Sequence, residues 1–425
     1  MKVLLISANR TEINMRTMPL GLAFVAQALT DRHHSVKMID CVGIDNIGSY
    51  IQGAIENFRP DIIGISLRNI DDQALLNTRF LYQDDREIIA RARKLSDKPI
   101  ILGGAGYSMF PEAILADSDA DMGIEGEGEA ALSMVLEKLE KGESPEGVPG
   151  LHIKGGAPAQ PRRFIKDTGS FPLPDPHYVM GQPVTADTWV PVQTRRGCAM
   201  DCSYCSTASI EGRTLRKRPV ASVIEWIGKL VKVGAHQLYF VDNTFNLPRP
   251  YALSLCRAIT DGGLNIKWRC IIYPWRIDEE LVAAMAGAGC FEISLGSESA
   301  DEEILRRMHK RFGRDDIAHA SRLFKKYNIK QMGFFMLGAP GETQQSVLDT
   351  LAFAASLELD ALKVTVGIRI YPHTALADEA RKEGIIEPDD PLLQPRFYIT
   401  PGLDEKWVRD TVAQWAAKQP NWIQG

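Results

Sequence analysis

Three cysteines stand close together near the middle of the chain. They are Cys198, Cys202 and Cys205, in a segment that follows a short apolar run. Three thiolates within one short loop can converge on a single metal centre, and cysteine thiolates are common ligands of zinc and of iron–sulfur clusters. The spacing therefore predicts a metal site built from all three cysteines.

The number of ligands bears on which metal the loop holds. A structural zinc site normally uses four protein ligands, and neither a second cysteine pair nor a Cys–His pair follows the loop. An iron–sulfur cluster also normally takes four thiolates, so three thiolates leave one iron open to a substrate or cofactor. We favour a catalytic cluster over zinc and over a chance spacing.

The other four cysteines are scattered singly, at Cys41, Cys256, Cys270 and Cys290. Each stands among apolar or strand-like neighbours and is interpreted as a small buried side chain. Seven cysteines with this spacing do not form a disulfide framework. The pattern favours a reducing cytoplasm as the location of the protein.

The region 188–385, which contains the cysteine loop, alternates apolar runs with helix-period stretches. The predicted strands are 190–194, 237–241, 266–272, 291–295, 331–337 and 362–368. The predicted helices are 221–233, 250–260, 279–288, 315–327 and 345–357. Six such units are fewer than the eight of a closed TIM barrel. We therefore expect a partial (βα)6 barrel, with the cysteines following its first strand.

Residues 1–145 alternate in the same way with shorter units. Apolar runs at 3–7, 36–39, 62–67, 100–102 and 122–124 predict strands. Helical periods lie at 20–29, 47–57, 84–95 and 129–139. Short continuous apolar strands between helices indicate a parallel sheet covered on both faces. This region is predicted to be a doubly wound α/β domain, flavodoxin-like or Rossmann-like.

Ligands of doubly wound sheets bind at the carboxyl ends of the strands. The residues at these predicted ends are polar or glycine: Asn9, Arg10, Ser66, Arg68, Asn69, Gly103, Gly104, Gly106, Glu125, Gly126 and Glu127. Their gathering on one rim predicts a large ligand whose polar edges meet backbone N–H groups.

Two further regions carry less information. Glycine and proline cluster in 146–187, which predicts a linker with one hairpin at about 151–161. Residues 386–425 are predicted to be a C-terminal extension, with a proline-rich stretch and one amphipathic helix near 405–418.

The composition is that of a soluble globular protein, with 45% hydrophobic residues, 24% charged residues and a net charge of −5. The negative charge argues against nucleic acid as a partner. No apolar run approaches the roughly 20 residues that cross a bilayer, so we expect no membrane association. The N-terminus reads as a first buried strand rather than an export signal.

The cysteine loop resembles that of the radical S-adenosylmethionine (SAM) superfamily, whose C-x3-C-x2-C motif has an aromatic residue, here Tyr204, before its last cysteine. The resemblance implies that the three cysteines hold a catalytic 4Fe–4S cluster and that SAM binds the open iron. The reduced cluster would then cleave SAM to methionine and a 5′-deoxyadenosyl radical. It also implies a flavodoxin or ferredoxin as electron donor.

Later segments match the same superfamily. Residues 294–299 look like its G-x-E-S element, and 338–342 resemble its G-x-P-G-E turn. The SAM-binding residues that the resemblance implies are Tyr204, Asp242, Ser297, Glu298, Arg311 and Gly338. Two alternatives stay open: Gly338 could serve only a tight turn, and Arg311 could be solvated. Asp242 and Glu298 are stronger candidates, because a buried strand end seldom carries an acid without a partner or ligand.

A doubly wound domain before such a barrel resembles the cobalamin (B12)-binding radical SAM enzymes, with matching segments at 19–22, 61–66, 103–106, 125–129 and 173–175. The resemblance implies that the rim residues named above bind cobalamin. The chain lacks the D-x-H-x-x-G loop whose histidine ligates cobalt in many cobalamin proteins. Arg68 would face the lower side of the corrin and disfavour an axial ligand; an ion pair with Asp71 or Asp72 is its alternative role.

The function that the resemblance implies is a cobalamin-dependent radical SAM methyltransferase. It would methylate an unactivated carbon of a small molecule or peptide, through methylcobalamin and the 5′-deoxyadenosyl radical. Two alternatives remain: a non-methylating rearrangement or oxidative cyclisation, and a radical SAM enzyme whose N-terminal domain has lost cobalamin. A methylthiotransferase acting on RNA would need three more N-terminal cysteines, where only Cys41 stands. A non-enzymatic redox sensor would not need SAM-binding acids, so Asp242 and Glu298 argue against that alternative.

Overall fold

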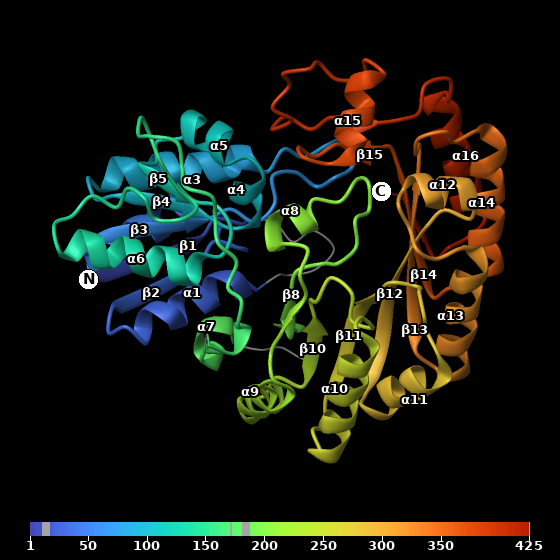
Figure 1. Ribbon diagram of the computed structural model, residues 1–425, viewed down its shortest axis with the longest axis horizontal. Helices are drawn as coiled ribbons and strands as arrows, with labels where there is room; N and C mark the ends of the chain where they lie inside the picture. Colours follow the sequence, from blue (N-terminus) through green and yellow to red (C-terminus); the bar gives the residue numbers. More distant parts are fainter. Residues whose placement is uncertain (11–17, 171, 181–187, 425) are drawn as a thin grey trace. The chain divides into compact units, whose positions relative to one another are not determined.

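The computed structural model describes residues 1–10, 18–170, 172–180 and 188–424. The chain forms two compact units (Figure 1). Unit 1 comprises Met1–Asp72, Phe80–Pro191 and Ser209–Gly212, and unit 2 comprises Gln73–Arg79, Val192–Ala208 and Arg213–Gly425. The predicted ends of the N-terminal domain, the linker and the barrel, at 145, 187 and 385, stay a prediction. Positions 171 and 181–187 of the expected linker lie outside the described residues.

Unit 1 contains a six-stranded sheet of order β2-β1-β3-β4-β5-β6. Its strands are β1 (Lys2–Ser7), β2 (Ser35–Asp40), β3 (Ile62–Ser66), β4 (Ile100–Gly103), β5 (Met122–Ile124) and β6 (Leu151–Ile153). The first five pair in parallel and β6 pairs antiparallel with β5. The order of the five parallel strands is that of flavodoxin, which confirms the predicted doubly wound fold.

Helices lie on both faces of this sheet (Figure 1). They are α1 (Leu20–Thr30), α2 (Ile47–Phe58), α3 (Tyr82–Leu95), α4 (Ala105–Met109), α5 (Pro111–Asp117) and α6 (Gly128–Glu140), followed by a 3-10 turn (Thr168–Ser170) and α7 (Pro176–Met180). Helix α1 packs against α6, and α2 packs against α3. The sequence did not predict α4 and α5, because helices of five and seven residues are too short to show a helical period.

Unit 2 contains a seven-stranded sheet of order β17-β14-β13-β12-β11-β10-β7. Its strands are β7 (Val190–Val192), β10 (Gln237–Phe240), β11 (Lys267–Ile272), β12 (Cys290–Glu298), β13 (Lys330–Leu337), β14 (Ala361–Val366) and β17 (Trp422–Gln424). Strands β10 to β14 and β17 pair in parallel. Parallel pairing confirms the predicted α/β class of this region.

The helices that follow these strands run along one face of the sheet (Figure 1). They are α9 (Val220–Lys232), α10 (Arg249–Asp261), α11 (Glu279–Gly287), α13 (Arg314–Lys326) and α14 (Gln344–Ser356). Each turns an apolar face inward; in α13 the buried side chains include Ile317, Ala320 and Phe324, at helical spacing. Strands and helices alternate here because each helix buries its apolar stripe against the apolar face of the sheet.

Smaller elements complete the chain. They are β8 (Arg195–Arg196), α8 (Thr207–Glu211), β9 (Arg216–Lys217), α12 (Glu302–Arg307), β15 (Ile368–Arg369), α15 (Ala375–Lys382), β16 (Phe397–Tyr398) and α16 (Glu405–Ala416). Helix α16 confirms the amphipathic helix expected near 405–418. Cys41, Cys256, Cys270 and Cys290 are buried and free, as predicted. Over the described residues, no helix combines the length and apolarity needed to cross a membrane.

Candidate active site

The cysteine loop connects β8 to α8 in unit 2. Gly197 has a φ of +88°, a conformation that glycine adopts readily, and it turns the chain into the loop. Cys198 is buried, Cys202 and Cys205 are partly exposed, and none of the three forms a disulfide.

The donor set of this loop fits a 4Fe–4S cluster with one open iron, because it offers three thiols that form no disulfide. In the part of the chain that the structure describes, no three His, Cys, Asp or Glu side chains are gathered closely enough to hold a metal ion. Ligation by Cys198, Cys202 and Cys205 stays a prediction.

Next to this loop lie three polar side chains joined by hydrogen bonds. The Tyr204 hydroxyl donates to Oε1 of Glu298 over 2.8 Å. The Lys310 ammonium donates to the same Oε1 over 3.0 Å and to the Tyr204 oxygen over 2.8 Å. The predicted SAM-binding residues Tyr204 and Glu298 thus meet beside the cysteine loop. Lys310 was missed by the sequence reasoning, which considered only its neighbour Arg311.

Burial makes these contacts strong. The side chains of Lys310 and Glu298 are only 3% and 10% exposed. Burial raises the pKa of Tyr204 well above its ordinary value, and the Glu298 charge adds to this rise. Burial alone lowers the pKa of Lys310, but Glu298, Tyr204 and Cys202 more than reverse it, so the pKa is raised. The ion pair with Glu298, whose atoms lie 3.0 Å apart, therefore favours the charged form of Lys310.

Glu298 ends β12 in a strained conformation. Its φ is +64°, which L-residues rarely adopt, and the register of β12 with β13 shifts between Gly296 and Glu298. The buried hydroxyl of Ser297 has no hydrogen-bond partner among the described residues. Strain and an unpartnered polar atom at one strand end are typical of functional sites.

Asp242 is bound to the start of the cysteine loop by hydrogen bonds. Its Oδ1 accepts the backbone N–H groups of Thr194 and Arg195 over 2.7 and 3.1 Å, and its Oδ2 accepts the Thr194 hydroxyl over 2.6 Å. The Arg195 Nε lies 3.3 Å from Oδ2. Both oxygens are used within the chain, where they fix the start of the cysteine loop. A role for Asp242 in SAM binding stays a prediction.

Arg195 completes this attachment. Its guanidinium donates to the carbonyl of Leu247 over 2.6 Å and stacks on the rings of Tyr251 and Phe245, at 4.6 and 5.5 Å from their centroids. The side chains of Arg195 and Asp242 are 1% and 0% exposed. A buried ion pair of this kind specifies one arrangement of β8, and hence the position at which the cysteine loop begins.

The predicted turn at 338–342 is present after β13. Gly338 has a φ of +104°; its N–H donates to Glu342 and its carbonyl accepts the N–H of Thr400 over 3.0 Å. Ala339 also donates to Glu342, over 3.0 Å. Both backbone groups of Gly338 are therefore used within the chain. This supports the simpler alternative, a tight turn that requires glycine.

Glu342 should make the stability of the protein depend on pH. Burial raises its pKa to about 7 even though the N–H groups of Gly338 and Ala339 lower it. Because the folded pKa lies above the ordinary value of 4.5, the contribution to stability is complete below pH 4.5 and is lost as the pH rises through about 7. Glu342→Gln, which stays neutral, should therefore be more stable than the wild type above that pH, by roughly 1–3 kcal/mol. Urea denaturation at acidic and alkaline pH checks this; parallel curves for the two proteins would contradict it.

Arg311 lies at the edge of the site. Its backbone N–H donates to the Tyr273 hydroxyl over 2.9 Å. Its guanidinium is 46% exposed and lies 3.9 Å from Oδ1 of Asp201. The structure thus places Arg311 beside the cysteine loop in a largely solvated state, so its role in SAM binding stays a prediction.

In unit 1, several of the predicted rim residues surround a small pocket. Asn9, Arg10, Arg68 and Asn69 line it, and α3 adds Leu81, Asp84 and Asp85. Two polar atoms there have no hydrogen-bond partner among the described residues, Nδ2 of Asn9 and Oδ2 of Asp85. Burial raises the pKa of Asp85 well above its ordinary value. The pocket therefore offers two unpartnered polar groups to the amide groups that surround a corrin, and in this respect it fits cobalamin.

The glycines of the rim also have a packing role. A Cβ at Gly104 would lie 2.4 Å from the carbonyl oxygen of Leu67, and one at Gly106 would lie 3.2 Å from that of Arg68. Only glycine therefore lets the start of α4 approach the end of β3 next to Ser66. Gly103 has no such close contact, since its Cβ would meet an atom only at 3.9 Å.

The acids after β5 are paired within unit 1. Glu125 lies 2.8 Å from the Arg162 guanidinium and 3.3 Å from His152. Glu127 accepts the N–H of Ile165 over 2.6 Å, and the N–H of Gly126 donates to Ser108 over 2.9 Å. These side chains attach the segment after β6 to the sheet, and their role in binding cobalamin stays a prediction.

Asp85→Ala is expected to weaken cobalamin binding about tenfold, because a buried hydrogen bond to a ligand contributes roughly 1–1.5 kcal/mol. Titration of hydroxocobalamin into the protein, followed by absorption, measures the dissociation constant. Asp84→Ala is the matched control: Asp84 lines the same pocket but is partly exposed. Equal affinities of the two variants would contradict a role for the buried acid.

Comparisons with known proteins agree with the division of the chain into an N-terminal doubly wound region and a later region that contains the cysteine loop. The B12 binding domain model matches residues 6–136, and the Radical SAM superfamily model matches residues 192–354. An uncharacterised methyltransferase of Pyrococcus horikoshii is 29% identical over 394 residues, which cover 89% of this chain and 83% of that protein. The cytidylyl-2-hydroxyethylphosphonate methyltransferase of Streptomyces wedmorensis is 24% identical and covers 98% of this chain and 89% of its own length.

A solved structure shares the fold. TsrM, a radical SAM methyltransferase from Kitasatospora setae with cobalamin and a 4Fe–4S cluster bound, superposes with a TM-score of 0.87 at 21% identity. The match covers 99% of this chain and 92% of that chain. Since both family models match in the order that the sequence predicted, the chain belongs to the cobalamin-binding radical SAM family.

Proposed function

We propose that this chain is a cobalamin-dependent methyltransferase that methylates an unactivated carbon of a small molecule or peptide. The observation that carries the proposal is the contact of Glu298 with Tyr204 and Lys310, because it joins a predicted SAM residue to the predicted cluster loop. The relatives from Pyrococcus and Streptomyces, both named methyltransferases, support methyl transfer over a rearrangement or cyclisation.

The cofactors of this radical SAM enzyme are a 4Fe–4S cluster, SAM and cobalamin, which supply radical chemistry and a transferable methyl group. The chain's own residues hold and orient them. Cys198, Cys202 and Cys205 would bind the cluster. The contacts of Glu298 with described residues all use Oε1, so Oε2 is available to accept hydrogen bonds from SAM. A flavodoxin or ferredoxin would deliver the electron.

Anaerobic reconstitution tests the proposal. The protein is incubated with iron, sulfide and hydroxocobalamin, desalted, and examined by absorption spectroscopy. We expect a cluster absorption together with a retained corrin spectrum. A cluster without retained corrin would overturn the methyltransferase and leave a radical SAM enzyme whose N-terminal domain binds no cobalamin. Absence of a cluster would overturn the proposal as a whole.

A further inference from the structure

Lys310 is a buried cation whose surroundings keep it beside the cysteine loop. The ammonium donates hydrogen bonds to Tyr204, which lies between Cys202 and Cys205 in the loop, and to Glu298. It also faces the rings of Tyr204, Tyr273 and Phe312, at 4.9, 5.7 and 5.8 Å from their centroids. Aromatic faces attract cations, so these rings stabilise a charge that water does not reach.

The backbone ties this lysine to the loop. Ser203 donates its N–H to the carbonyl of Met308 over 3.1 Å, and the His309 ring lies 3.0 Å from the carbonyl oxygen of Asp201. The segment before Lys310 is therefore fixed to the residues on either side of Cys202.

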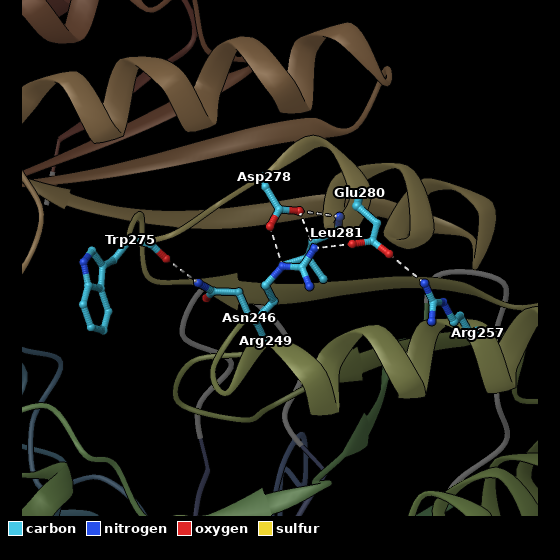
Figure 2. A network of polar contacts seen from close by, with 7 residues as sticks. All are labelled: Asn246, Arg249, Arg257, Trp275, Asp278, Glu280 and Leu281. Atoms are coloured by element: carbon cyan, nitrogen blue, oxygen red, sulfur yellow. Dashed lines mark hydrogen bonds and ion pairs between the residues drawn. The ribbon is translucent and has the colours of Figure 1, made fainter.

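The aromatic wall is fixed as well. Tyr273 packs edge-on against Phe312, with ring centroids 4.9 Å apart. Asn246 anchors the loop that carries Tyr273: its side chain donates to the carbonyls of Tyr273 and Trp275 over 2.9 and 3.3 Å, as Figure 2 shows for Trp275. It also accepts the N–H of Tyr273 over 3.1 Å. The ring that covers Lys310 thus has a defined position.

We propose that Lys310 raises the reduction potential of the cluster held by this loop, by placing a fixed positive charge beside Cys202. The inference rests on the proposed function only in requiring that the loop binds a cluster. Reduction takes one electron from an external donor and adds one negative charge to a cluster that already carries three protein thiolates. A nearby cation stabilises the reduced form more than the oxidised form, and therefore favours reduction.

Glu298 acts in the opposite direction. The carboxylate and the ammonium form an ion pair, so the cluster would meet a dipole rather than a lone charge. The two residues should therefore shift the potential in opposite directions.

Redox titration of the reconstituted cluster, followed by electron paramagnetic resonance, tests the proposal. The titration contains dithionite as reductant and neither SAM nor cobalamin, so it reports on the cluster alone. At a fixed applied potential we expect Lys310→Gln to lower the ratio of reduced to oxidised cluster about tenfold, which is about 59 mV for one electron. Glu298→Gln should raise that ratio, and Lys310→Arg, which keeps the charge, should restore the wild-type value.

Two controls separate the outcomes. Arg306→Gln removes an exposed cation from the preceding helix and should leave the potential unchanged. Lys310→Gln leaves Glu298 buried without its partner and could prevent folding. In that case the cluster potential is measured instead in the Lys310→Gln/Glu298→Gln double variant and in Glu298→Gln, and is compared with that of the wild type. A cluster that forms normally but has the wild-type potential in these variants overturns the inference and leaves the proposed function intact. Failure of the wild type to form any cluster overturns the proposed function itself.

Discussion

Replacing any one of Cys198, Cys202 and Cys205 with alanine is expected to abolish SAM cleavage. The loop offers three thiols, and a cluster with one open iron needs all three. Without the cluster no electron reaches SAM, so 5′-deoxyadenosine should fall below detection. Iron and sulfide analysis of each reconstituted variant, together with chromatographic assay of 5′-deoxyadenosine, measures both losses.

Cys41→Ala is the control for these variants. Cys41 is also a free thiol, but it is buried in unit 1, so its loss should leave iron content and SAM cleavage unchanged. A cysteine-loop variant that retained the iron content and the SAM cleavage of the wild type would show that the ligands have been assigned wrongly.

Asp242→Asn should cause the largest loss of stability of any single change considered. The carboxylate pairs with Arg195, and the two side chains are 0% and 1% exposed. Removing one partner leaves the guanidinium buried without a counter-charge, which typically costs about 3–5 kcal/mol. Urea denaturation measures the change in the free energy of unfolding. Because Asp242 also holds Thr194 and Arg195, the variant should bind less iron on reconstitution.

A second ion pair in unit 2 gives a matched control. Asp278 pairs with Arg249 near the start of α11, and Figure 2 shows this pair joined to Glu280 and Arg257. The side chain of Asp278 is 45% exposed, and asparagine caps a helix as well as aspartate does. Asp278→Asn should therefore cost less than about 1 kcal/mol. Equal losses in the two variants would contradict a special role for the buried pair.

The sequence was sufficient to predict both sheets, because buried parallel strands are continuous apolar runs such as β1 and β3. It was not sufficient for the shortest elements. The three residues of β17 carry no pattern, and only the tertiary structure places Trp422 beside Leu362. The same holds for α4 and α5, which have five and seven residues and therefore make fewer than two helical turns.

The sequence could name candidate site residues where chemistry depends on residue type, as for the three cysteines and Glu298, and their roles stay predictions. It could not show contacts that depend on a distant partner. Asp242 suggested a ligand because a buried acid is rare, yet its partner Arg195 lies 47 positions away in the chain. Lys310 stands among charged residues that suggest solvent exposure. Its buried neighbours Met308 and Phe312 were the only local sign that this segment packs inward.

Transfer of the SAM methyl group to cobalamin can be tested directly with a labelled methyl group. The reconstituted protein is given SAM with a deuterated S-methyl group and a strong reductant, and the cobalamin fraction is analysed by mass spectrometry. Because this half of the reaction needs no substrate, it is independent of the substrate's identity. We expect bound cobalamin that carries the labelled methyl group, with S-adenosylhomocysteine formed in equal amount. Cobalamin that stays bound but unlabelled, while SAM is consumed only to 5′-deoxyadenosine, would contradict methyl transfer.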